Sequence, residues 1–151
     1  MSQAHARIFE SLRYDVLARL VDVRGTIDHA YARIPEARIR EQFDMVLDKM
    51  ASYLATEDSE LYRSFASRYM AMRVGEGVSP ENLIHSVVAI GDIVIKVAEE
   101  KVPPSQEPSA VQERHDFTRA VVRMNFVAAR MLVILLGDEV KRREQQLRSI
   151  A

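Results

Sequence analysis

Four histidines have the widest chemical range of any residues in this chain: His5, His29, His85 and His115. A carboxylate-bridged di-metal bundle needs the pair Glu-x-x-His on two helices. Here Glu81 precedes His85 by four positions instead of three. Glu113 precedes His115 by only two. Glu81 and His85 could still hold one metal ion from a shared helix face, but a capping glutamate beside a partly buried histidine is the commoner explanation. We therefore expect no metal site.

A histidine on an apolar helix can also bind haem, as the proximal histidine of globins does. Residues 83–95 around His85 are largely apolar, which makes His85 the candidate haem ligand, with His115 as a second. A histidine that packs in the core or lines a cavity is more common at such a position. We expect no cofactor and keep haem at His85 as the alternative.

Other catalytic motifs are missing from the sequence. The chain has no cysteine, so thiol nucleophiles and thiolate metal sites are excluded. It has no Gly-x-Ser-x-Gly elbow, and Gly75-Glu76-Gly77 lacks the lysine of a phosphate-binding loop. Carboxylates are plentiful, but charged faces of amphipathic helices account for them. We predict that the protein is not an enzyme.

Length and composition describe one ordinary helical domain. The chain has 151 residues, of which 48% are apolar and 28% charged, with a formal net charge of -1. This balance creates no general field that would attract nucleic acid. Five glycines and five prolines are fewer chain breakers than a barrel or a β-sandwich normally contains. We predict an all-α fold, either globin-like or an orthogonal bundle of about five helices with a long C-terminal helix.

No segment looks suited to export or to membrane insertion. His5, Arg7 and Glu10 interrupt the N-terminal residues, which therefore lack the apolar core of a secretory signal. The longest uninterrupted apolar run covers residues 131–136, whereas a spanning helix needs roughly 20 such residues. The absence of cysteine suits a reducing compartment. We predict a cytoplasmic protein with neither a membrane nor a nucleic acid as partner.

Apolar residues spaced three and four apart predict the helices. The predicted helices cover residues 3–24, 35–56, 58–75 and 79–98, with a short helix or elbow at 26–34 and a last helix of some 40 residues from Ser109. Gly25 and Gly75 are placed where helices end, and Ser79-Pro80-Glu81 is the clearest helix start. Gly91 lies in an apolar stripe, where we expect it to let another helix approach closely.

Three arginines, Arg73, Arg123 and Arg130, stand near or within apolar stretches, where an arginine needs a partner. We expect ion pairs on helix surfaces and keep recognition of an anion as the alternative. Seven methionines indicate either an adaptable core or the lining of a ligand cavity.

The last helix carries a heptad-like seam, whose members lie at alternating steps of three and four. The residues that we assign to a dimer or signalling helix are Asn125, Ala128, Leu132, Leu135, Glu139 and Arg143. Asn125, polar within the seam, is a candidate for setting the register. Because the seam becomes polar, we predict a helical domain over residues 1–140 and a projecting helix over 141–151. That helix would lead to an output domain or pair with its own copy.

The segment at residues 73–84 reads Arg-Val-Gly-Glu-Gly-Val-Ser-Pro-Glu-Asn-Leu-Ile; it follows several amphipathic helices and precedes the long last one. This motif and the helix order resemble the N-terminal sensory domain of RsbR-type regulators, the co-antagonists of bacterial stressosomes, over about residues 5–140. In that family an arginine, a glycine three or four residues later and a capped helix entry recur. The resemblance implies a globin-like domain without haem that dimerises and passes its last helix to a C-terminal output domain.

A non-enzymatic sensory or regulatory domain of a bacterial signal-transduction protein, linked to the stress response, is the function that this resemblance implies. It also implies a homodimer that relays a signal through the long last helix to a protein partner or a covalently linked output domain. Because no output domain follows Ala151, we expect a separated sensory fragment or a stand-alone relative. The alternatives are a globin-like protein that binds haem or a small ligand, and an enzyme that uses helix-borne carboxylates.

Overall fold

The computed structural model describes residues 2–101 and 106–150. Within these residues the chain forms six α-helices and no strand. The helices are α1 (Ser2–Ile27), α2 (His29–Ala32), α3 (Glu36–Thr56), α4 (Ser59–Gly75), α5 (Pro80–Lys101) and α6 (Pro108–Ile150). The all-α prediction is confirmed. The five longer helices are those predicted, and the predicted elbow at 26–34 holds the single turn of α2.

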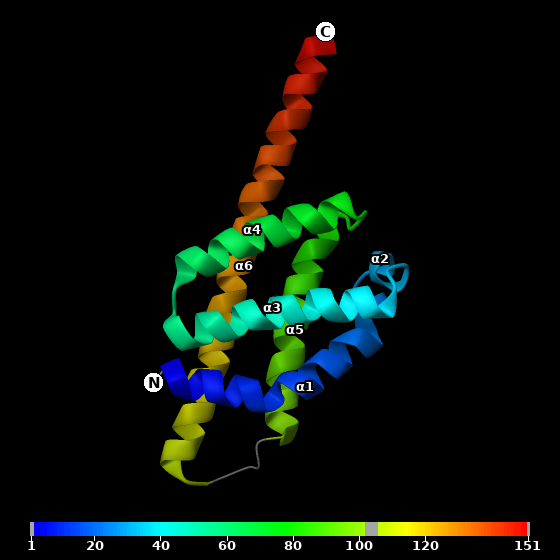
Figure 1. Ribbon diagram of the computed structural model, residues 1–151. Helices are drawn as coiled ribbons and strands as arrows, with labels where there is room; N and C mark the ends of the chain where they lie inside the picture. Colours follow the sequence, from blue (N-terminus) through cyan, green and yellow to red (C-terminus); the bar gives the residue numbers. More distant parts are fainter. Residues whose placement is uncertain (1, 102–105, 151) are drawn as a thin grey trace.

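The longer helices form two layers that cross at a large angle (Figure 1). One layer contains α1, α3 and α4, and α3 packs against both of its neighbours. The other contains α5 and α6, which pack against each other. Between the layers, α1 packs on α5 and α4 packs on α6. The arrangement is an orthogonal helical bundle.

The core lies between the two layers, where amphipathic helices turn their apolar faces inward. Fully or almost fully buried side chains come from all five long helices and include Phe9, Leu20, Phe43, Leu47, Met70, Val94, Val97, Val121 and Met124. α5 packs on α1 of one layer and on α6 of the other. Val88, from the apolar stripe of α5, is exposed.

Capping side chains determine where α4 and α5 begin, and the start of α5 at Ser79 was predicted. The Asp58 carboxylate accepts hydrogen bonds from the N–H groups of Glu60 at 3.1 Å and Leu61 at 3.2 Å. The Ser79 hydroxyl accepts one from the N–H of Asn82 at 3.3 Å. Both caps satisfy amide groups that have no partner inside the helix. Each joins residues at most three positions apart, so the sequence alone shows them.

The end of α1 differs from the prediction. Gly25, the predicted C-terminal residue, lies inside the helix, which continues to the buried Ile27. Burial of that side chain offsets the roughly 1 kcal/mol that a glycine costs a helix. The chain turns instead at Asp28, whose carboxylate caps α2 by accepting the N–H of Ala30 at 2.7 Å. Pro35, predicted as the first residue of the next helix, is the N-cap of α3.

Gly91 lets α6 approach α5 closely, as predicted. A Cβ atom placed on Gly91 would lie 2.7 Å from Cγ and 2.9 Å from Oδ1 of Asn125. These separations are far inside van der Waals contact, so the Asn125 amide packs directly against the glycine backbone.

Replacing Gly91 with alanine is expected to lower the free energy of unfolding by about 1–2 kcal/mol, because overpacking outweighs the gain in helix propensity. In an Asn125→Ala background the colliding atoms are gone, and the same replacement should stabilise the protein. Urea unfolding of the wild type, both single variants and the double variant measures this coupling. An equal effect of G91A in both backgrounds would contradict the close contact.

α6 is one continuous helix of 43 residues. Its first part packs against the body, and its C-terminal part projects beyond it (Figure 1). Residues 141–150 are all exposed. In the part of the chain that the structure describes, α6 is the one helix long and apolar enough to cross a membrane. Helices of soluble cores pass the same test, and 28% of its most apolar window is buried in the protein.

Candidate functional site

Arg73, in the last turn of α4, is fully buried, with an exposed fraction of 0%. Its guanidinium carbon lies 4.8 Å from the ring centre of Tyr31 and 4.7 Å from that of Tyr69. An aromatic face attracts a cation, and the attraction is strongest away from water. The motif that carries the sequence resemblance therefore begins with a residue of the core, where we had predicted a surface ion pair.

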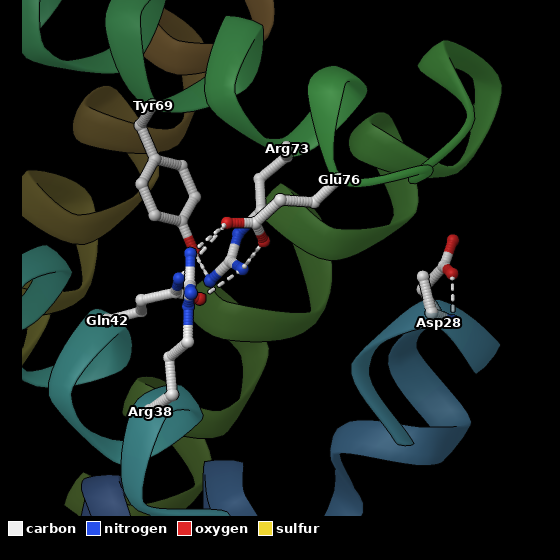
Figure 2. Close-up of polar contacts among 7 residues, drawn as sticks. Asp28, Arg38, Gln42, Tyr69, Arg73 and Glu76 are labelled. Atoms are coloured by element: carbon white, nitrogen blue, oxygen red, sulfur yellow. Dashed lines mark hydrogen bonds and ion pairs between the residues drawn. The ribbon is translucent and has the colours of Figure 1, made fainter. Parts of the chain in front are cut away.

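Three protein groups accept hydrogen bonds from this guanidinium (Figure 2). One terminal nitrogen donates to the amide oxygen of Gln42 and to the Glu76 carboxylate at 3.0 Å; the other donates to the Tyr69 hydroxyl at 2.5 Å. Glu76 also accepts hydrogen bonds from Arg38 at 3.3 Å and Gln42 at 3.2 Å. We call these five residues the Arg73 cluster.

The Arg73 cluster fastens the end of α4 to α3. Burial raises the pKa of the Tyr69 hydroxyl well above its ordinary value, so this group stays neutral at physiological pH and can accept the bond from Arg73. The terminal nitrogens of Arg73 already have partners, although its Nε and the Tyr31 hydroxyl have none among the residues that the structure describes. Asp28 lies apart from the cluster, at the α2 corner (Figure 2). Anion recognition, the alternative prediction for Arg73, therefore gains no support.

His85, the predicted haem ligand, lies on the exposed surface of α5. The expectation of a core or cavity position is wrong, because the helix buries the following residue, Ser86, instead. A haem site encloses its ligand histidine between apolar walls, and His85 does not fit one. Among the described residues, no three His, Asp or Glu side chains form a group that could hold a metal ion.

Four members of the predicted seam on α6 face the protein's own body. Ala128 and Leu132 are buried in the core. Leu135 packs against that core, and Asn125 packs on the glycine of α5. Correcting the prediction, we assign these four residues to packing within the chain, so they are not available to a second copy.

Glu139 and Arg143 continue the predicted seam beyond the body. The Glu139 carboxylate accepts hydrogen bonds from Arg142 at 2.6 Å and from Arg143 at 3.2 Å. These bonds, with that from Arg142 the stronger, hold the pKa of the Glu139 carboxyl below its ordinary value. Ion pairs between such exposed side chains add little to stability. They leave this part of α6 dependent on its own helix propensity or on a partner.

A second apolar face of α6, one residue out of step with the predicted seam, is largely exposed to solvent, although its Leu136 also packs partly against the core. Phe126 is 70% exposed and Val133 is 63% exposed. Four residues of this face follow one another at intervals of seven: Phe126, Val133, Val140 and Leu147. Five more alternate with them at steps of three and four: Val122, Ala129, Leu136, Arg143 and Ile150. We call these nine residues the outward face. Alternation of this kind over about four heptads is the pattern of a coiled-coil seam.

The outward face could have been found from the sequence. Its apolar residues continue to Leu147 and Ile150, whereas the predicted seam loses its apolar residues after Leu135. Arg143 belongs to both sets. Persistence of the apolar pattern along the projecting part of α6 is therefore the signal that separates the outward face from the seam used by the core.

Comparisons with known proteins leave the function to be argued from this geometry. No family model matches the chain, and neither the curated proteins nor the solved structures include a significant match. The described residues thus offer two features for a functional proposal, the outward face and the clefts between the helices.

Proposed function

We propose that this chain is a non-enzymatic regulatory domain that forms a homodimer through the outward face of α6 and relays a signal along that helix. The observation that carries the proposal is the exposed heptad stripe, which runs from the body to the projecting end. Contiguous exposed apolar surface marks an interaction site in soluble proteins. A second copy supplies a matching stripe, because a twofold dimer buries the same surface on both subunits.

The residue types of the outward face favour two parallel strands. Val133 and Val140 occupy positions of the a type, where β-branched residues favour dimers over larger assemblies. Arg143 interrupts the stripe with a charge, and polar residues in a seam set its register at some expense in stability. Parallel helices would carry both projecting ends toward the same output partner.

Membrane insertion of α6 is the competing explanation for its exposed apolar residues. Arg123 and Arg130 lie within the apolar stretch, and each charge would cost roughly 2.5–3.5 kcal/mol at the centre of a bilayer. The opposite side of the helix, including Val121 and Leu132, would also have to leave the core. Pairing with a second copy requires neither change, so we favour the dimer.

The resemblance to RsbR-type sensory domains supports the same function, since it implies a dimer with a signalling last helix. The globin-like character, the cytoplasmic location and the link to a bacterial stress response belong to this proposal. The haem-binding alternative loses its main candidate residue, because the His85 side chain is exposed.

Sedimentation equilibrium of the purified chain across the micromolar range tests the proposal. We expect the mass to approach twice the 17.2 kDa of one chain as the concentration rises. A monomer at every concentration would contradict the homodimer. Flotation with phosphatidylcholine vesicles distinguishes the competing explanation, since a chain that stays monomeric and floats with lipid uses its outward face for the membrane.

A further inference from the structure

A cleft opens at the end of the molecule where α5 ends and α6 begins, with α1 as a third wall. Its volume is about 750 Å³, within the range of roughly 300–1,000 Å³ that small-molecule sites occupy. Its apolar lining consists of Ile8 of α1, Ile95 and Ala98 of α5, and Ala110, Val111 and Phe117 of α6. We call it the α5–α6 cleft.

Small side chains leave this space open. Ala98 and Ala110 end at Cβ on two different walls, and Ile8 and Ile95 are only partly buried. Protein interiors usually fill such space, because an apolar wall without a neighbour loses its dispersion contacts. The apolar surface that remains accessible can be covered by a ligand.

Four charged or titratable side chains line the cleft beside its apolar residues. They are Glu99, Glu113, Arg114 and His115. None of these four forms an ion pair or a hydrogen bond with another residue among those that the structure describes. Two carboxylates outnumber the single guanidinium, so the charged groups at the cleft do not favour an anion. Because most of the lining is apolar, the cleft favours an uncharged ligand held by apolar contact.

His5 provides an unpaired hydrogen-bonding group behind one wall. Its side chain is 7% exposed, and its ring meets Phe117 edge-on with centroids 6.3 Å apart. Within the described residues its Nδ1 atom is buried and has no hydrogen-bond partner. Buried polar groups nearly always have a partner. His5 does not itself line the cleft, so it supports the wall that Phe117 forms.

We propose that the α5–α6 cleft binds an uncharged, lipophilic small molecule. Residues 110–118 of α6 form one wall, and the same unbroken helix carries the outward face. Ligand binding would therefore act directly on the helix that we assign to signal relay. This regulatory role rests on the proposed function, whereas the binding itself does not.

Fluorescence titration with 1-aminoanthracene, an uncharged aromatic probe, tests the binding. We expect saturation at one probe per chain and displacement by n-alkanols. Alkanol affinity should rise about fourfold with each added methylene group until the chain fills the cleft, and should rise no further beyond that length. Unsaturable binding, or alkanol affinity that keeps rising without a limit, would overturn the proposal.

Two variants place the probe in the cleft. Ala98→Trp and Ala110→Trp fill it from different walls, and each is expected to weaken probe binding at least tenfold. The chain has no tryptophan of its own, so blue-shifted emission from the new indole shows that it has entered apolar surroundings. Wild-type affinity in a variant with blue-shifted emission would overturn the proposal. If one variant misfolds and emits at longer wavelength, probe binding to the other variant tests the cleft. If both misfold, the length at which alkanol affinity stops rising tests it.

Val133→Glu is the matched control, because it changes the outward face and leaves the cleft intact. Probe affinity should stay within about twofold of the wild type, because Val133 does not line the cleft. Loss of binding in V133E would place the probe on the outward face and overturn the cleft. A wild-type chain that is monomeric yet binds the probe in the cleft would contradict only the proposed function.

Discussion

Replacing Arg73 with alanine is expected to lower the free energy of unfolding by about 3–5 kcal/mol, as removal of one partner from a buried charged pair typically does. The variant loses the stacking on two tyrosine rings and leaves the Gln42 amide oxygen without its donor. For a chain of this size the loss corresponds to a fall in melting temperature of roughly 10 °C. Thermal and urea unfolding followed by circular dichroism measure both quantities.

Arg68→Ala is the matched control for this prediction. Arg68 lies on the same helix and is exposed, so its removal should change stability by no more than about 0.5 kcal/mol. An Arg73→Ala protein as stable as the Arg68→Ala protein would show that the Arg73 cluster does not hold α4 to α3. A large difference between the two would show that Arg73, the first residue of that motif, acts in the interior of the fold.

Replacing Val133 with glutamate is expected to raise the dissociation constant of the homodimer at least 100-fold. In a twofold parallel pair the two new carboxylates would face each other across the seam, away from water, which costs both desolvation and repulsion. A 100-fold change corresponds to about 2.7 kcal/mol. Sedimentation of the variant beside the wild type measures it, and circular dichroism checks that α6 stays helical.

Ile134→Glu provides a close comparison, because Ile134 is the next residue, is also apolar and is 49% exposed. It lies off the outward face, so its replacement should change the dissociation constant by less than about threefold, as substitutions outside an interface core usually do. Equal weakening by V133E and I134E would argue against the outward face as the dimer seam. It would favour an interface on another side of the helix, or a general effect of charge on α6.

The helix starts were predictable from the sequence because their causes are local. Asp58 and Ser79 cap the N–H groups of residues two or three positions ahead, so the signal lies within one helical turn. The break at Gly75 and the close approach at Gly91 likewise follow from glycine in a defined setting. The end of α1 at Ile27 depends on burial by distant helices, and the local rule that favoured Gly25 gave the wrong boundary.

The outward face was harder to predict because α6 has two apolar faces in adjacent registers. Leu132 is followed by Val133, and Leu135 by Leu136. Within residues 125–136 periodicity accepts either set, and only the continuation of one set to Leu147 and Ile150 separates them in the sequence. Ala128 and Leu132 are buried against the other helices. The outward face, one residue later in register, therefore faces solvent at positions such as Val133.

The burial of Arg73 depends on residues far away in the chain. Gln42 lies 31 positions earlier, and Tyr31 comes from a different helix. No local pattern predicts such a meeting. His85 shows the reverse, since its apolar neighbours suggested the interior while the helix turned it outward. In both cases the fold, rather than the neighbouring sequence, determined the environment of a charged or titratable residue.

The unbroken course of α6 also makes it a lever. From Leu132, the last fully buried residue, to Ile150 the helix extends for about 27 Å at 1.5 Å per residue. A tilt of about 10° where the helix leaves the body would carry its tip sideways by about 5 Å, close to the 5.4 Å pitch of a helical turn. A shift of side chains inside the body too small to change the fold would thus become a displacement that a partner at the tip could distinguish.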